Sequence, residues 1–331
     1  MDEIRWGVVG PGRIAHPVAA DMEHVPHARL VAVASRSQQR AEDFAVTHGA
    51  DRAHGSYRAI IEDPEVDVLY IATPHPQHYV IALAAIEAGK AVLVEKAFTA
   101  TVAGAQEVIE VARSRGVFTM EAMWTRFQPA MVRLRELVDE GAIGQVRYVQ
   151  ADLGVDRPYD PSDRLFDPAQ GGGAMLDLGV YVVSLAQYLL GNPDRVEVAG
   201  SLALTGVDLE AALLLGYDDG RAATLLASLR QQSPGSARVI GTDGVIEVPP
   251  RFHHPHSITV TRGDGAPEVI DAPPLGGGYS HELIEVTECL RAGRTESAVM
   301  PLADTLAVQR ILNQACEALG VHHQEDAGVQ I

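Results

Sequence analysis

One lysine, Lys96, is the first candidate for chemistry in this chain. Only two of the 26 basic residues are lysines, Lys90 and Lys96, and all the others are arginines. A guanidinium stays charged in proteins, whereas a desolvated ammonium can release its proton. Lys96 follows an apolar stretch, 91–94, and comes directly after Glu95. We therefore expect Lys96 to take part in proton transfer; the alternative is a plain ion pair with Glu95 or with a phosphate group.

A second candidate is the pair Asp177 and Tyr181, which follows three consecutive glycines at 171–173. The two residues are four positions apart in a stretch with helical periodicity, so both side chains project from one face. A phenol beside a carboxylate can orient a substrate hydroxyl and pass on its proton. The alternative is that Asp177 balances the helix dipole and that Tyr181 is a core residue.

A glycine-rich turn near the start of the chain predicts a nucleotide site. The segment Gly7–Ala15 contains G-x-G-x-x-A after an apolar stretch and before a helical pattern, which is the context that a dinucleotide-binding turn requires. Gly10 permits the tight turn, Gly12 lets the backbone approach a pyrophosphate, and Ala15 keeps helix and strand close. The pyrophosphate would face the helix N-terminus; the alternative is a glycine turn without a ligand. The residues assigned to this site are Gly10, Gly12, Arg13 and Ile14.

The next apolar stretch ends in Ser35-Arg36-Ser37, which indicates the cofactor. An NAD site usually places Asp or Glu about 20 residues after the glycines to bind the ribose 2′-hydroxyl. No carboxylate stands here, and Arg36 between two hydroxyls suits a 2′-phosphate. The sequence therefore favours NADP, with NAD possible; the alternative is that Arg36 stacks on adenine without discriminating.

The first 122 residues alternate short apolar stretches with helical patterns, which predicts an α/β Rossmann domain with a parallel, doubly wound sheet. Ligands bind at the carboxyl edge of such a sheet, so we add Thr73, Pro74, His78, Glu95 and Lys96 to the cofactor site. The expected strands are 5–9, 30–34, 66–72, 91–94 and 117–120, and the expected helices are 13–22, 38–48, 78–88 and 102–115.

Residues 123–331 predict an α+β substrate domain with a large, open, mostly antiparallel sheet, whose uncovered apolar face would be buried in a homodimer or a higher homo-oligomer. The final helices are expected to cover one side or to return toward the first domain. Ser280 is expected to cap the first of them, and 276–279 to form a mobile flap. The expected strands are 146–153, 196–204, 211–216, 222–229, 239–241, 245–248 and 257–261, and the expected helices are 129–140, 174–190, 281–291 and 304–319.

Taken together, these motifs resemble the GFO/IDH/MocA oxidoreductase family over essentially the whole chain. The segment Met120–Phe127 is more particularly similar to the dimeric dihydrodiol dehydrogenase branch, which includes NADP-linked xylose dehydrogenases. The motifs that carry the family resemblance are Gly10-x-Gly12-x-x-Ala15, Thr73-Pro74-x-x-x-His78, Glu95-Lys96 and Gly171-Gly172-Gly173-x-x-x-Asp177-x-x-x-Tyr181.

The resemblance implies hydride transfer between NADP and a hydroxyl or carbonyl of a sugar or cyclic diol. It also implies acid–base roles for Lys96 and Tyr181, with Asp177 orienting them and with Trp124 and Arg126 near the substrate. The chain departs from many relatives in having Ala97 where they have proline. It also has tyrosine at 181 where many sugar-oxidising relatives have histidine, which argues against inositol-dehydrogenase-like chemistry. Two alternatives stay open: a nucleotide-sensing regulator on the same scaffold, and an enzyme that retains NAD while it cleaves glycosides.

The bulk composition limits the classes of partner. A net charge of −18 argues against a broad nucleic-acid or anionic-membrane surface, and no apolar run is expected to be long enough to span a membrane. The N-terminal residues do not predict a signal peptide, and two cysteines, Cys289 and Cys316, fit reduced thiols in the cytoplasm. We expect no metal, because the run His253–His256 lacks a supporting carboxylate or cysteine set.

Overall fold

The structure is a computed structural model that describes residues 3–331. The chain divides into two compact units. The first consists of Met1–Trp124, Leu275–Leu306 and Gln324–Ile331, and the second of Thr125–Pro274 and Ala307–His323. This division lies two residues beyond the boundary expected after residue 122, and it assigns two C-terminal segments to the first unit.

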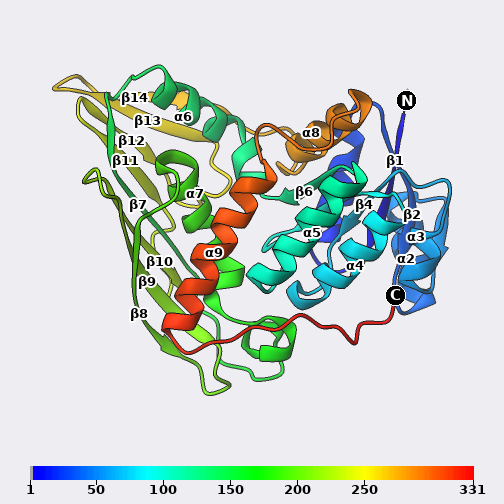
Figure 1. Cartoon of the computed structure of the whole chain (residues 1–331). Helices are drawn as coiled ribbons and strands as arrows, with labels where there is room; N and C mark the ends of the chain where they lie inside the picture. Colours follow the sequence, from blue (N-terminus) through cyan, green and yellow to red (C-terminus); the bar gives the residue numbers. More distant parts are fainter. Residues whose placement is uncertain (1–2) are drawn as a thin grey trace. The chain divides into compact units, whose positions relative to one another are not determined.

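The first unit is built on a six-stranded parallel sheet with the strand order β3-β2-β1-β4-β5-β6 (Figure 1). The order reverses between β1 and β4, so ligands are expected at the carboxyl ends of these strands. The strands are β1 (Ile4–Val9), β2 (Ala28–Ala34), β3 (Arg52–His54), β4 (Val68–Ile71), β5 (Ala91–Glu95) and β6 (Thr119–Ala122). The helices between them are α1 (Ala15–Asp21), α2 (Gln38–His48), α3 (Tyr57–Ile61), α4 (His75–Glu87) and α5 (Val102–Arg115).

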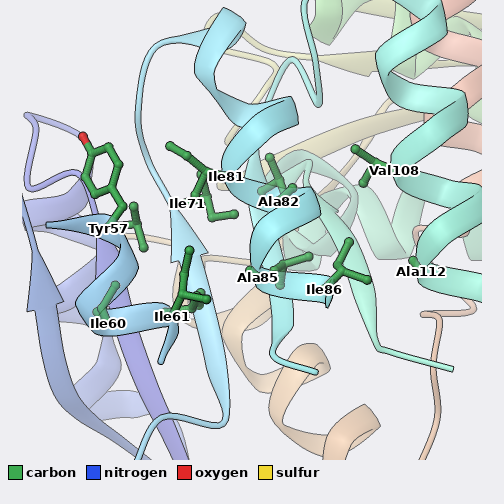
Figure 2. Close-up of a cluster of buried hydrophobic side chains, with 14 of the residues drawn as sticks. Tyr57, Ile60, Ile61, Ile71, Ile81, Ala82, Ala85, Ile86, Val108 and Ala112 are labelled. Atoms are coloured by element: carbon green, nitrogen blue, oxygen red, sulfur yellow. The ribbon is translucent and has the colours of Figure 1, made fainter. Parts of the chain in front are cut away.

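A continuous apolar core fixes these helices on the sheet. Every residue of β4 and β5 is buried, which is typical of parallel strands covered on both faces. Figure 2 shows Ile71 of β4 beside Ile81, Ala82, Ala85 and Ile86 of α4, with Val108 and Ala112 on α5. The predicted doubly wound sheet is therefore confirmed. Strand β3 and helix α3 were not predicted, because three half-buried residues and five helical residues give no clear periodicity.

The second unit is built on an eight-stranded sheet with the order β14-β13-β12-β11-β7-β10-β9-β8. Only the β7–β10 pair is parallel, so the predicted open, mostly antiparallel sheet is confirmed. The strands are β7 (Val146–Gly154), β8 (Arg195–Leu202), β9 (Asp208–Gly216), β10 (Ala222–Ser228), β11 (Ala237–Gly241), β12 (Gly244–Val248), β13 (Ser257–Arg262) and β14 (Glu268–Asp271). Helix α6 (Pro129–Asp139) precedes β7, and α9 (Leu302–Ala318) begins in the first unit and ends in the second.

One apolar helix forms the core of the second unit, and it differs from the prediction in two ways. It starts as a π-turn, Met175–Gly179, and becomes α7 only over Val180–Leu190. The expectation that no segment is long enough to span a membrane was also wrong, because the helical stretch Pro168–Leu190 has the length and composition of a span. However, 89% of its most apolar window is buried, and α7 packs on β7 and β10, as a core helix does.

Helix α8 (Ser280–Arg291) belongs to the first unit, where it packs on β1. The expected helices 281–291 and 304–319 are thus both present within two residues. The loop before α8, 275–279, takes part in the site described next.

Candidate active site

The glycine turn after β1 contains two glycines with different roles. The backbone conformation and packing of the chain require glycine at position 10, whereas they do not require it at position 12. Gly10 has φ +86°, and a Cβ there would lie 2.9 Å from Cγ2 of Thr73. A Cβ on Gly12 would meet no protein atom closer than 3.9 Å. Packing within the chain therefore does not explain Gly12, and a ligand that approaches the backbone does. The residues present fit a dinucleotide pyrophosphate at this turn.

A depression of about 370 Å³ lies beside this turn. Arg40, in the first turn of α2, reaches the turn and donates from Nη2 to the carbonyl of Pro11 at 3.3 Å. Sequence reasoning missed Arg40, although its place four residues after Arg36 on an N-terminal helical turn was a usable signal. The lining residues are Pro11, Gly12, Arg13, His16, Arg40, Asp43, Phe44 and Thr47.

The segment Ser35-Arg36-Ser37 is ordered by its own hydroxyls. Ser35 Oγ accepts from the Ser37 amide at 3.2 Å, and Ser37 Oγ accepts from the Arg40 amide and so caps α2. Both hydroxyl oxygens therefore serve as acceptors, and each hydroxyl still has its own proton to donate. A 2′-phosphate is an acceptor and suits such donors.

The side chain of Arg36 is exposed and lies close enough to Tyr57 to influence the pKa of its hydroxyl. Burial raises the pKa of Tyr57, and the nearby guanidiniums of Arg36 and Arg40 oppose this shift. Figure 2 shows the Tyr57 ring at the margin of the apolar cluster with its hydroxyl turned outward. Tyr57 thus links the core to the cationic end of the nucleotide site, a link that the sequence did not reveal.

Lys96 lies at the end of β5, on the same sheet edge as the glycine turn. The carboxylate of Glu95 orders the backbone there, because Oε1 accepts from the Tyr70 hydroxyl at 2.6 Å and Oε2 from the Lys96 amide at 3.2 Å. The Lys96–Ala97 peptide bond is cis. The other lysine, Lys90, donates to the carbonyls of Asp63 and Val66, both at 2.7 Å, which is a structural role.

Two histidines of α4 connect the loop after β4 to Lys96. Nδ1 of His78 lies 3.0 Å from the Ala97 carbonyl, and its Nε2 lies 2.7 Å from the Thr73 carbonyl. His75 Nε2 lies 3.2 Å from the Lys96 carbonyl. Burial lowers the pKa of His78 to about 4, and a neutral ring donates to only one of its two carbonyls. His78 was expected to contact cofactor; its fully buried ring makes it a positioning residue for the Lys96–Ala97 loop.

The loop 275–279 is anchored by Asp21, the last residue of α1. Asp21 Oδ1 accepts from the Gly277 amide at 2.7 Å, and Oδ2 accepts from the amides of Tyr279 and Ser280 at 2.7 and 3.1 Å. The Tyr279 ring stacks on Trp124 at 4.2 Å between centroids. The prediction that Ser280 caps α8 was wrong, because Asp21 supplies that acceptor and Ser280 is the first helical residue. The segment 276–279, which was expected to be a mobile flap, is therefore held through hydrogen bonds of its backbone amides.

In the second unit, Asp177 lies in the π-turn and is paired with Arg164. Arg164 Nη2 donates to Asp177 Oδ1 at 2.9 Å, and the carboxylate is mostly buried. π-turns inside helices are frequent at functional sites. A guanidinium that is half in solvent holds this carboxylate in one orientation. No sequence pattern indicates that Arg164 is the partner of Asp177.

Tyr181, in the first turn of α7, is buried and lies against a histidine ring. The ring centroids of Tyr181 and His253 are 5.0 Å apart. The main chain at His253 is held by Thr125, whose Oγ1 donates to the His253 carbonyl at 2.8 Å. The run His253–His256 had been considered only as a metal candidate, so its first member is a site residue that sequence reasoning missed.

Arg126 is 3% exposed, and its guanidinium contacts α7. It donates to Gln187 Oε1 at 2.7 Å and to Ser184 Oγ at 3.4 Å, and it lies 4.6 Å from the centroid of the Tyr188 ring. These contacts fix the helix that carries Tyr181. Arg126 was expected near the substrate, and we interpret it as a residue that positions α7.

The expected site residues therefore fall into two groups. The nucleotide-binding residues, Lys96 and Trp124 belong to the first unit, whereas Arg126, Asp177 and Tyr181 belong to the second. Within the first unit, the strand ends that carry the glycine turn and Lys96 lie at one sheet edge. That Lys96 and Tyr181 act on one substrate stays a prediction.

Comparisons with known proteins show the family to which the chain belongs. Residues 4–123 match the family described as "Oxidoreductase family, NAD-binding Rossmann fold", and residues 131–247 match the GFO/IDH/MocA C-terminal domain. The trans-1,2-dihydrobenzene-1,2-diol dehydrogenase of Mus musculus is 38% identical to this chain, over 98% of this chain and 99% of that protein.

Two solved structures extend the comparison. An aldose-aldose oxidoreductase from Caulobacter crescentus, complexed with glycerol, has a TM-score of 0.87 at 26% identity and covers 96% of this chain and 98% of its own. A mutant 3-ketoreductase from Actinomadura kijaniata, in complex with TDP-benzene and NADP, has a TM-score of 0.84 at 25% identity and covers 97% and 99%. The chain therefore belongs to the GFO/IDH/MocA family of oxidoreductases and is an NAD(P)-dependent dehydrogenase.

Proposed function

We propose that this enzyme transfers hydride between NADP and the hydroxyl or carbonyl of a sugar or cyclic diol. The observation that carries the proposal is that three neighbouring strands end at one sheet edge in the glycine turn, in Thr73-Pro74 and in Glu95-Lys96. This edge combines a turn open to pyrophosphate with an ionisable amine. The names of the dihydrodiol dehydrogenase and the aldose oxidoreductase support the substrate class.

The preference for NADP is supported by the cationic end of β2. Arg36 and Arg40 lie there with the hydroxyls of Ser35 and Ser37, and no carboxylate occupies this segment. NADPH is expected to bind at least tenfold more tightly than NADH, a difference of about 1.4 kcal/mol. Arg36→Ala should remove most of that difference. Equal affinities in fluorescence titrations of the unmodified enzyme would contradict the preference.

The proposed proton path uses Lys96 and Tyr181. When bound, the nicotinamide supplies the hydride chemistry. The Tyr181 hydroxyl and the Lys96 amine exchange the proton of the substrate hydroxyl, and Asp177, held by Arg164, orients them. His75 and His78 keep the main chain at Lys96 in place through the contacts of their rings with the Lys96 and Ala97 carbonyls.

An absorbance assay of reduced cofactor tests this function. The enzyme is mixed with NADP⁺ or NAD⁺ and a panel of pentoses, hexoses and cyclic diols, and with NADPH and the corresponding carbonyl compounds. Turnover on at least one panel member, with NADP⁺ preferred, is the expected result. Tight NADPH binding with no turnover across the panel would favour a regulatory protein, and product formed without net change in cofactor would favour a cofactor-retaining enzyme.

A homodimer through the sheet of the second unit is part of this proposal. Leu214 on β9 and Ile240 on β11 are exposed, whereas their strand neighbours Leu213, Leu215 and Val239 are buried. The exposed residues therefore lie on the face opposite the core, and a second copy is the simplest cover for such a face. Figure 1 shows α7 along the other face of this sheet.

Light scattering tests the dimer with a matched pair of variants. Leu214→Arg should yield monomers, whereas Val46→Arg, on the exposed side of α2 in the other unit, should leave a dimer. A monomer of the unmodified chain at micromolar concentration would contradict the dimer. We also place the enzyme in the cytoplasm, because both cysteines are free thiols; cell fractionation checks this location.

A further inference from the structure

Three residues outside the proposed active site converge in the second unit. Asp208 begins β9, Cys316 lies in the last turns of α9, and His323 follows that helix. A carboxylate oxygen, the thiol sulfur and an imidazole nitrogen all lie within 4.8 Å of one another. Nothing in the dehydrogenase chemistry proposed above uses these three side chains.

The polar atoms of this cluster are poorly satisfied. Asp208 is fully buried; its Oδ2 accepts from the Met175 amide at 2.6 Å, but its Oδ1 has no hydrogen-bond partner among the described residues. His323 Nε2 is also buried and has no partner within residues 3–331. Leaving a buried polar atom without a hydrogen-bond partner destabilises the folded state. Two such atoms beside a buried thiol indicate a missing common partner.

The charges of the three groups suit a divalent cation. A carboxylate and a thiolate together carry two negative charges, and a neutral imidazole adds a third donor without charge. A divalent ion bound by this set gives a site with no net charge, which is the condition for burying charged groups without a large desolvation penalty.

The donor types select the metal. Calcium and magnesium take oxygen ligands, whereas sulfur, nitrogen and oxygen together are typical of zinc. Bonds to zinc of about 2.0–2.3 Å place the ligand atoms roughly 3–4 Å apart, so the cluster needs only a small contraction. We propose that Asp208, Cys316 and His323 bind one Zn²⁺ ion, with water as the fourth ligand.

The proposed ion has a structural role, because of what the cluster touches. Gly173 has φ +123°, and a Cβ there would lie 2.1 Å from Asp208 Oδ1, so the glycine turn lies directly on the carboxylate. Asp208 also accepts a hydrogen bond from the amide of Met175, and Met175 is the first residue of the π-turn that contains Asp177. Zinc would join the end of α9 to the start of this π-turn. It is a positioning element and not a catalytic metal.

Metal binding by the whole enzyme tests the site. The protein is stripped with chelator and titrated with Zn²⁺, and with Co²⁺ as a spectroscopic probe. We expect one equivalent of Zn²⁺ per chain, a rise in Tm, and a thiolate-to-cobalt charge-transfer band with the visible bands of a tetrahedral site. Labelling of Cys316 by a thiol reagent in mild denaturant should be slowed by Zn²⁺.

Cysteine variants supply the matched control. Cys316→Ser should lose the charge-transfer band and bind at least tenfold more weakly. Cys289→Ser should retain both band and affinity, because Cys289 is the other buried thiol and donates to Glu285 in the first unit. His323→Gln, at a partly buried position after α9, tests the site if Cys316→Ser does not fold.

Three results would overturn the proposal. The first is a wild-type protein whose Tm and cobalt spectrum do not respond to metal. The second is a band or a zinc equivalent that persists in Cys316→Ser or His323→Gln. The third is a loss of the band in Cys289→Ser alone. None of these readouts depends on dehydrogenase activity.

Discussion

Asp21→Asn should destabilise the first unit strongly, although it removes only a charge and replaces one oxygen with an amide group. The carboxylate accepts three backbone hydrogen bonds, from Gly277, Tyr279 and Ser280, at 2.7, 2.7 and 3.1 Å. Hydrogen bonds to a charged group contribute about 1.5–3 kcal/mol each. They share one acceptor and are not additive, and the asparagine keeps one oxygen. We therefore expect a loss of about 2–4 kcal/mol of unfolding free energy.

Tryptophan fluorescence during urea unfolding measures this loss directly. The chain has two tryptophans, Trp6 in β1 and Trp124, and both belong to the first unit. The Tyr279 ring stacked on Trp124 should also loosen, so the native emission should change. Asp51→Asn is the control, because that carboxylate is exposed and, among the described residues, its ion pair is with Arg29 on the surface. Its expected effect is within about 1 kcal/mol. Equal stabilities of the two variants would refute the anchoring role of Asp21.

Two further predictions concern carboxylates. Burial raises the pKa of Glu282, and its two oxygens have no hydrogen-bond partner among the described residues. The folded state then keeps a proton that the unfolded state loses above about pH 4.3, so stability falls as pH rises through this window. Glu282→Gln should remove that fall, by about 1.4 kcal/mol per pH unit; parallel urea-stability profiles of variant and wild type from pH 5 to pH 8 would contradict it. Arg164→Gln should lower kcat about tenfold with little change in NADPH affinity, because Asp177 loses the partner that orients it; unchanged kcat would argue against this role.

The nucleotide-binding half was predictable because its signals are local. The expected bounds of α2 and α5 agree with the structure, since a serine or threonine caps each helix and a left-handed glycine ends it. The glycine turn and Arg36 are equally local. Strand β3 is too short and too polar to produce a periodicity, and the π-turn at 175–179 has the same apolar pattern as an ordinary helix.

The partners of the site residues were not predictable, because tertiary packing brings them together. Asp21 and the loop that it binds are more than 250 positions apart in the sequence. His253 contacts Tyr181 from a loop whose histidines suggested only a metal site. The expectation that the chain binds no metal considered only residues close in sequence. The zinc ligands proposed here come from three separate segments whose spacing carries no recognisable pattern.

The central proposal is that Lys96 and Tyr181 serve one proton path, and a double-mutant cycle on these two residues tests it most directly. A lost acid–base group typically costs about a hundredfold to ten-thousandfold in rate. Lys96→Met and Tyr181→Phe should each lose turnover on that scale and keep NADPH binding. The double variant should lose far less than the product of the two, because groups that act as a unit are not additive. Near-normal turnover of Tyr181→Phe, or losses that multiply, would contradict the account.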